Sequence, residues 1–101
     1  MASRLKLHEE LCEILGSRNV YYNPPASVKM KYPAIVYSRA KIDNTHANNA
    51  VYNQRVAYDV TVVHSDPDSE VTKTISKLPL CRYVRPYKAD NLNHDTFILY
   101  Y

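Results

Sequence analysis

The residues that could take part in chemistry are four histidines, two cysteines and a short run of carboxylates. His8 and Cys12 stand four residues apart on a segment of helical periodicity, so the two could ligate one metal ion. Such a site needs two further ligands, and none stands at a recognisable spacing. The histidines follow no H-E-x-x-H pattern; they are His8, His46, His64 and His94. We therefore expect no metal site.

Other catalytic chemistry is equally poorly supported. A cysteine nucleophile must be accessible, yet Cys12 and Cys81 both stand among apolar residues. Phosphate-binding loops of the Walker and Rossmann kinds need several glycines, and the chain has one. The carboxylates of the "SDPDSE" stretch suit the start of a helix, where they face the positive end of its dipole. The sequence predicts neither an enzyme nor a cofactor.

Length and composition predict one globular domain spanning residues 1–101, because the chain is too short for a second core. Apolar residues make up 46% of it, which excludes the disordered class. No apolar run reaches the roughly 20 residues that cross a bilayer. The first residues, "MASRLKLHEELCEILG", mix acids and bases, unlike a signal peptide. We expect a product of the cytoplasm with both cysteines reduced in the core and no membrane partner.

The charge pattern leaves two interpretations open. The net charge of +3 comes partly from "CRYVRPYK" at 81–88, where three bases alternate with Tyr83 and Tyr87. Bases interleaved with aromatic rings can bind nucleic acid. Ten acidic residues are spread through the same chain and no nucleic-acid motif accompanies the segment, so a solvated face is the favoured interpretation. Ten tyrosines favour a protein that binds or assembles with other proteins, since tyrosine is enriched at interfaces.

Hydrophobic periodicity predicts two helices. The first spans residues 3–15, with Leu7, Leu11 and Ile14 on one face and Gly16 as the residue that ends it. The second begins with Asp66 as N-cap and Pro67 at its first position, and it ends before Pro79. Its buried stripe is Val71, Ile75 and Leu78.

Strand signals occur at residues 20–22, 34–42, 56–63, 80–84 and 94–101. In the clearest of them, Val60 and Val62 alternate with Asp59 and Thr61. We predict an α+β fold: an antiparallel sheet of about four to five strands with two helices packed on one face, and Leu7, Leu11, Ile14, Val60, Val62, Val71 and Ile75 in the core.

A polar stretch, "DNTHANNAVYNQR" at 43–55, separates the two central strands. Neighbouring strands are usually joined by about two to five residues, so this hairpin-like loop is far longer than a connection requires. Loops of this length in compact domains are more often functional or disordered than accidental, so the stretch is either a functional segment or a surface loop without a partner.

The order of elements and several stretches resemble the small tail terminator, or tail completion, proteins of long-tailed bacteriophages. The resemblance covers nearly the whole chain, and "PPASVKMKYPAIVY" followed by "VTVVHSDPDSE" is its most telling part. It implies an antiparallel sheet with helices against one face, and a hexameric ring that caps the tail tube and ends its growth.

The implied partners are copies of the chain itself, the major tail tube protein and the head–tail connector or stopper. The resemblance places the protein in the virion, at the head–tail interface, after assembly in the bacterial cytoplasm, with genome DNA passing through the lumen without specific binding. It implies that the polar stretch is the interface arm, whose candidate contact residues are His46, Asn48, Asn49, Val51, Tyr52 and Arg55.

Two rival functions remain open. A connector adaptor or stopper would share the same class of fold and the same kind of partner. A small nucleic-acid-binding module would use the basic, tyrosine-rich segment instead, and its affinity would fall steeply with added salt.

Overall fold

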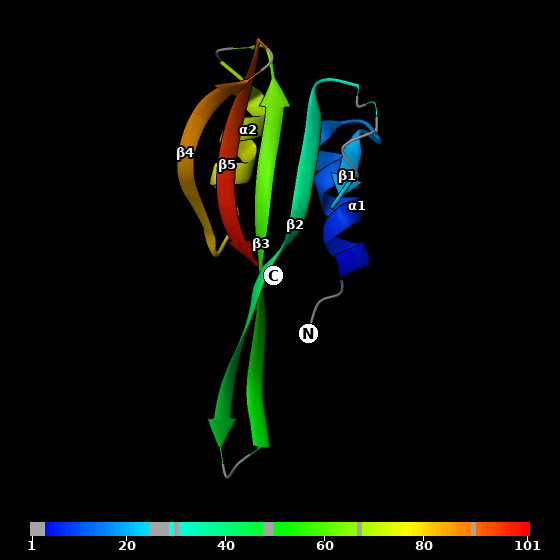
Figure 1. The fold of residues 1–101 in the computed structure, drawn as a ribbon. Coiled ribbons are helices and arrows are strands. Elements are labelled where there is room, and N and C mark those ends of the chain that lie inside the picture. Colours follow the sequence, from blue (N-terminus) through cyan, green and yellow to red (C-terminus); the bar gives the residue numbers. More distant parts are fainter. Residues whose placement is uncertain (1–3, 25–28, 30, 48–49, 67, 90) are drawn as a thin grey trace.

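The chain forms one helix, three strands, a second helix and two further strands, which places the protein in the α+β class, as predicted (Figure 1). This computed structural model describes residues 4–24, 29, 31–47, 50–66, 68–89 and 91–101. For residues 43–47 and 50–55 it describes the backbone. The elements are α1 (Arg4–Leu15), β1 (Val20–Tyr22), β2 (Ala34–Ala47), β3 (Ala50–His64), α2 (Glu70–Ser76), β4 (Cys81–Ala89) and β5 (Leu92–Tyr100).

Helix α1 follows the sequence pattern closely. Leu7 and Leu11 recur at i, i+4 and are both buried, while Ile14 packs at the edge of the core. Gly16 ends the helix with φ +78°, and its N–H donates to the Cys12 carbonyl at 2.9 Å. A left-handed residue at this position suits glycine, so the predicted end of the helix is confirmed.

Helix α2 is shorter than predicted and has a different cap. Ser69 is the N-cap, and its hydroxyl accepts a hydrogen bond from the Thr72 N–H at 3.3 Å. The prediction of Asp66 as the N-cap is wrong, because its carboxylate accepts a hydrogen bond from the Asp68 N–H in a turn before the helix. Pro67, predicted at the first helical position, lies outside the described residues. Ile75 is buried beneath the helix as predicted.

The sheet has the strand order β1-β2-β3-β5-β4 and is mixed, not purely antiparallel. β1 runs parallel to β2, with Val20 opposite Ile35 and Tyr22 opposite Tyr37. The predicted all-antiparallel sheet is therefore wrong at this edge. Residues 23–33 are long enough to return the chain to the starting end of β1, which a parallel pair requires.

Strands β2 and β3 continue through most of the stretch predicted as a hairpin-like loop. β2 runs past Ile42 to Ala47, and β3 starts at Ala50 instead of Val56. Hydrogen-bonded pairing satisfies the backbone of polar residues as well as that of apolar ones, so the loss of apolar alternation did not end the strands. β4 is also longer than the strand predicted at 80–84, because Pro86 is tolerated in a strand at the edge of a sheet.

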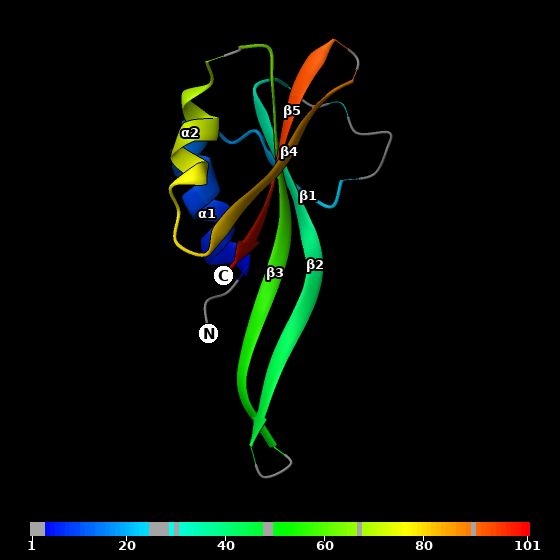
Figure 2. The ribbon, with the colours of Figure 1, turned by 90° about the vertical axis from the view of Figure 1, so that its left-hand side faces the viewer.

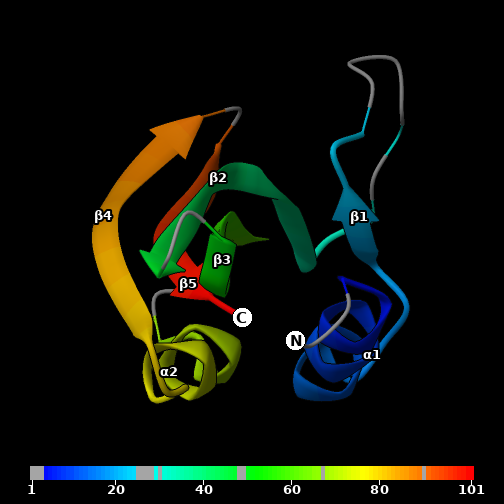
Figure 3. The ribbon, with the colours of Figure 1, turned by 90° about the horizontal axis from the view of Figure 1, so that it is seen from below.

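The core lies between the helices and one face of the sheet. Figures 2 and 3 show α1 and α2 on the same side of the strands. Leu7, Leu11, Val60, Val62 and Ile75 are all buried there, as predicted. Val71 packs against this cluster.

Among the tyrosines whose side chains the structure describes, two are part of this core. Tyr37 and Tyr58 are buried, although the composition favoured a surface role for the tyrosines. The Tyr37 hydroxyl accepts a hydrogen bond from Arg4 at 3.2 Å and lies 2.7 Å from His8 Nδ1. Tyr37 therefore joins helix α1 to the sheet through polar as well as apolar contacts.

Candidate functional site

The polar segment forms the outer half of a two-stranded arm that extends beyond the body of the protein (Figures 1 and 2). Its ladder runs from the pair Asp43–Arg55 to the pair Ala47–Ala50 at the tip. The arm makes the molecule elongated, with principal extents of 51 × 28 × 23 Å. An isolated two-stranded ribbon is marginally stable in water, so such an arm gains most from a partner surface.

The predicted contact residues are distributed along this arm. His46 pairs with Val51 near the tip, and Arg55 pairs with Asp43 near the base. Asn48 and Asn49 lie outside the described residues. The backbone thus brings two of the predicted residues, His46 and Val51, directly opposite each other.

Two register shifts mark the arm. Tyr52 is an extra residue on β3, because Val51 pairs with His46 while Asn53 pairs with Thr45. Ala40 is an extra residue on β2 at the base of the arm, between the paired residues Arg39 and Lys41. Bulges of this kind bend a strand and increase its twist, and Figure 1 shows the two strands crossing at the base of the arm. The arm is therefore turned relative to the body sheet.

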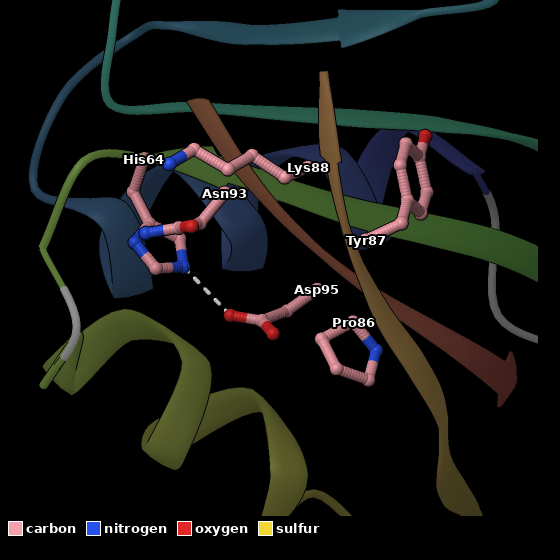
Figure 4. Close-up of a pocket in the computed structure, with 6 residues that line it drawn as sticks. All are labelled: His64, Pro86, Tyr87, Lys88, Asn93 and Asp95. Carbon is pink, nitrogen blue, oxygen red and sulfur yellow. Dashed lines mark hydrogen bonds and ion pairs between the residues drawn. The ribbon is translucent and has the colours of Figure 1, made fainter. Parts of the chain in front are cut away.

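A polar cluster lies at the opposite end of the body, where β3 ends (Figure 4). His64 Nε2 lies 2.6 Å from Asp95 Oδ2, and the same carboxylate accepts hydrogen bonds from the Thr72 hydroxyl at 2.9 Å and the Tyr83 hydroxyl at 3.0 Å. Burial acts to raise the pKa of Asp95, but its hydrogen bonds with His64, Thr72 and Tyr83 outweigh burial and lower it. The carboxylate is thus ionised at neutral pH.

This cluster borders a hollow of about 410 Å³ that Pro86, Lys88 and Asn93 also line. A histidine beside an aspartate resembles half of a catalytic triad, but the second ring nitrogen of a general base must be within reach of the substrate. Here Nε2 is bonded to Asp95, and Nδ1 is buried without a hydrogen-bond partner among the described residues. The geometry makes the cluster a tie between α2 and strands β3, β4 and β5.

A second hollow, of about 370 Å³, is mainly apolar and lies near the base of the arm. We call it the turn pocket; it is lined by Glu10, Leu78, Pro79, Leu80, Leu99, Tyr100 and Tyr101. Tyr101 is hydrogen-bonded to Glu10, and burial together with this bond raises the pKa of the phenol to about 12. The Tyr101 N–H donates a hydrogen bond to the carbonyl of Val56, the residue that follows the arm, at 3.0 Å. This bond places the pocket at the base of the arm.

The basic segment forms the exposed outer strand of the sheet. Residues 82–89 are exposed throughout, including the three bases Arg82, Arg85 and Lys88. The two aromatic rings already have partners within the chain. Tyr83 packs edge-on against Phe97, and Tyr87 stacks on His94 with the ring centres 4.6 Å apart. His94 covers one face of the Tyr87 ring, while Tyr87 as a whole remains 44% exposed.

Metal and thiol chemistry gain no support from the described part of the chain. It contains no group of three or more potential metal ligands. His8 Nδ1 lies 2.7 Å from the Tyr37 hydroxyl. Cys12 is buried, while burial raises the pKa of the half-buried Cys81 thiol and makes it less reactive. Among the described helices, none is long and apolar enough to span a bilayer.

Sequence reasoning missed both hollows. The His64–Asp95 cluster joins residues 31 positions apart, and only the antiparallel pairing of β3 with β5 brings them together. Pro79 predicts the end of the second helix, but Leu80 lies in the turn before β4 and not in the strand predicted at 80–84, and its residue type carries no turn signal. Comparison of the chain with protein-family models, curated proteins and solved structures gave no match.

Proposed function

We propose that this chain is a structural protein of a phage tail: a tail terminator that assembles as a ring, caps the tail tube and joins it to the head connector. The observation that supports this proposal most directly is the arm at 43–55, a paired hairpin that leaves the body of the subunit. The resemblance of "PPASVKMKYPAIVY" and "VTVVHSDPDSE" to tail terminators supports the same role. The protein then acts by binding other proteins and needs neither catalysis nor a cofactor.

The composition of the arm fits a reversible assembly contact. Its sequence combines amide side chains with Val51 and Tyr52, and its two charged residues, Asp43 and Arg55, stand at paired positions near the base. A long apolar hairpin would aggregate through its free edges before assembly, whereas a polar one stays soluble until it meets its partner. In the proposed virion the partners are neighbouring copies, the tube protein and the connector, and genome DNA passes through the ring without specific binding.

The test is a variant with a shortened arm. Residues 43–55 are replaced by Asn-Gly, which joins the paired residues Ile42 and Val56 through a two-residue turn. The body should keep its thermal midpoint, because the core that the structure describes is built from residues outside the removed segment, such as Leu11, Val60 and Ile75. Ring formation, followed by light scattering and electron microscopy, should be lost, and tail tubes assembled with the variant should have uncontrolled lengths.

A matched control keeps the arm at full length and changes Asn44 and Asn53 to glutamine. This control should assemble like the parent protein. If the shortened variant also formed rings and capped tubes normally, the proposed role of the arm would be wrong. If the intact protein bound a connector ring and never a tail tube, it would be an adaptor or stopper instead.

A further inference from the structure

The turn pocket lies at the end of the body from which the arm leaves. Two backbone hydrogen bonds fix this position: the Tyr101 N–H donates to the Val56 carbonyl, and the Tyr100 N–H donates to the Leu80 carbonyl. In Figures 1 and 2 the C-terminal end lies at the base of the arm, while the arm itself points away from the body. The arm cannot fill the pocket of its own subunit unless its ladder with the body strands is broken.

The lining of the pocket is suited to binding a protein surface and not to binding a small polar ligand. Its walls are aliphatic and aromatic, from Leu78, Pro79 and Leu99 to Tyr100. Among the described lining residues, Glu10 is the one with a charged side chain, and its carboxylate already accepts a hydrogen bond from the Tyr101 hydroxyl. A binding partner must therefore bring apolar or aromatic surface and little charge.

Leu80 at the rim is held in an unfavourable conformation. The Cys81 N–H donates to the Leu78 carbonyl at 3.3 Å, which closes a turn with Pro79 and Leu80 at its centre. Leu80 has φ +58°, where glycine or asparagine is normally required, and its side chain is 59% exposed. A bulky apolar side chain that is exposed, on a residue with a strained backbone, does not stabilise the isolated fold. Such outliers often mark binding sites.

We propose that the turn pocket receives the hairpin arm of a second copy of this chain. This inference rests on the proposed function, because it names the surface through which the ring closes. Each copy carries one arm and one pocket, so the contact is head-to-tail, and head-to-tail contacts form closed rings when the rotation between copies permits. The arm is mostly polar, and the part of its sequence that suits the pocket is the pair Val51 and Tyr52, with Tyr52 at a bulge near the tip. Its two charged residues, Asp43 and Arg55, are of opposite sign and stand at paired positions near the base, away from the tip.

Disulfide cross-linking tests this contact directly. In a Cys81→Ser background, one preparation carries Tyr52→Cys and a second, tagged preparation carries Leu80→Cys. Mixing them under mild oxidation should give a covalent dimer of the two different chains, resolved on a non-reducing gel. The control replaces Leu80→Cys by Val84→Cys, which is exposed on β4 but does not line the pocket. A yield with Val84→Cys equal to that with Leu80→Cys would overturn the inference.

A second variant separates binding from folding. Leu80→Gly removes the strain at φ +58° and should raise the thermal midpoint, while it weakens self-association about tenfold through loss of the exposed side chain. Rings that form equally well with Leu80→Gly, without the specific cross-link, would overturn the pocket contact and leave the proposed function standing. A parent protein that stays monomeric at every concentration would overturn both.

Discussion

His64 Nε2 and Asp95 Oδ2 lie 2.6 Å apart, where the last residue of β3 lies beside the first half of β5. Asp95 also accepts hydrogen bonds from Thr72 on α2 and Tyr83 on β4. One largely buried carboxylate therefore holds four elements together at the end of the body opposite the arm. This arrangement stabilises the scaffold from which the arm extends.

Asp95→Asn should destabilise the protein in a pH-dependent way. The folded-state pKa of Asp95 is lowered, so its contribution is fully present above the unfolded value of about 3.9 and is lost as the pH falls through the folded value. At pH 7 the variant should lose about 1.5–3 kcal/mol of unfolding free energy, the usual range for hydrogen bonds to a charged group.

Urea denaturation at pH 7 and at pH 3 measures this effect. The difference between parent and variant should shrink at pH 3, where protonation of Asp95 weakens the cluster in the parent as well. Asp68→Asn serves as the control, because Asp68 is exposed, and it should change stability by less than about 0.5 kcal/mol. A difference that stayed constant with pH would show that the charge of Asp95 does not matter.

Two leucines on α1 should respond very differently to truncation. Leu11 is completely buried against the sheet, whereas Leu5 is 66% exposed on the same helix. Leu11→Ala should cost about 2–5 kcal/mol, since it leaves a cavity in the core. Leu5→Ala should cost less than about 0.5 kcal/mol. Chemical denaturation gives the free energy of unfolding of both variants. Equal losses for Leu11→Ala and Leu5→Ala would mean that the helix packs through a different face.

The Glu10–Tyr101 hydrogen bond should make the protein sensitive to alkali. The phenol pKa is raised to about 12, so this contribution is fully present below the unfolded value of about 10 and is lost as the pH rises from there to about 12. Tyr101→Phe should be less stable than the parent at pH 8, and the difference should narrow above pH 10. Thermal melts of the parent, Tyr101→Phe and a second variant, Glu10→Gln, at pH 8 and above pH 10 test this. A difference in thermal midpoint between parent and variants that does not change with pH would mean that the hydrogen bond is unimportant.

Much of the fold follows from local sequence. The i, i+4 spacing of Leu7 and Leu11, with Gly16 after the last turn, predicts α1 correctly. The alternation around Val60 predicts a central strand with its buried face. Both signals are short-range, and the side chains that carry them also make the core, so local preference and burial agree.

The rest depends on partners far away in the chain. Asp66 and Ser69 both suit an N-cap, and the choice between them depends on where Ile75 can reach the core. The arm is invisible to hydrophobic periodicity, because its two strands are defined by backbone pairing with each other, which polar residues make as well as apolar ones. The role of Asp95 likewise requires the pairing of β5 with both β3 and β4, which no single segment specifies.

The last prediction concerns the free edge of β4, which must not pair with the wrong chain before assembly. β4 has β5 as its one neighbour in the sheet, and residues 82–89 are exposed. Pro86 lacks an N–H to donate, Val84 is the extra residue at a register shift, and Lys88 adds a charge. Proline, bulges and lysine are the devices that keep sheet edges from aggregating.

The double variant Pro86→Thr, Lys88→Thr should therefore fold with a nearly unchanged circular dichroism spectrum but aggregate several-fold faster on standing at neutral pH. Threonine restores a backbone donor and favours the strand, while the loss of one positive charge weakens repulsion between edges. Lys77→Thr is the matched control, because it removes the same charge from an exposed position at the end of α2. Turbidity and thioflavin fluorescence should rise for the double variant and stay at the parent level for the control. Equal rates for the two variants would mean that net charge, and not the shape of the β4 edge, keeps the protein soluble.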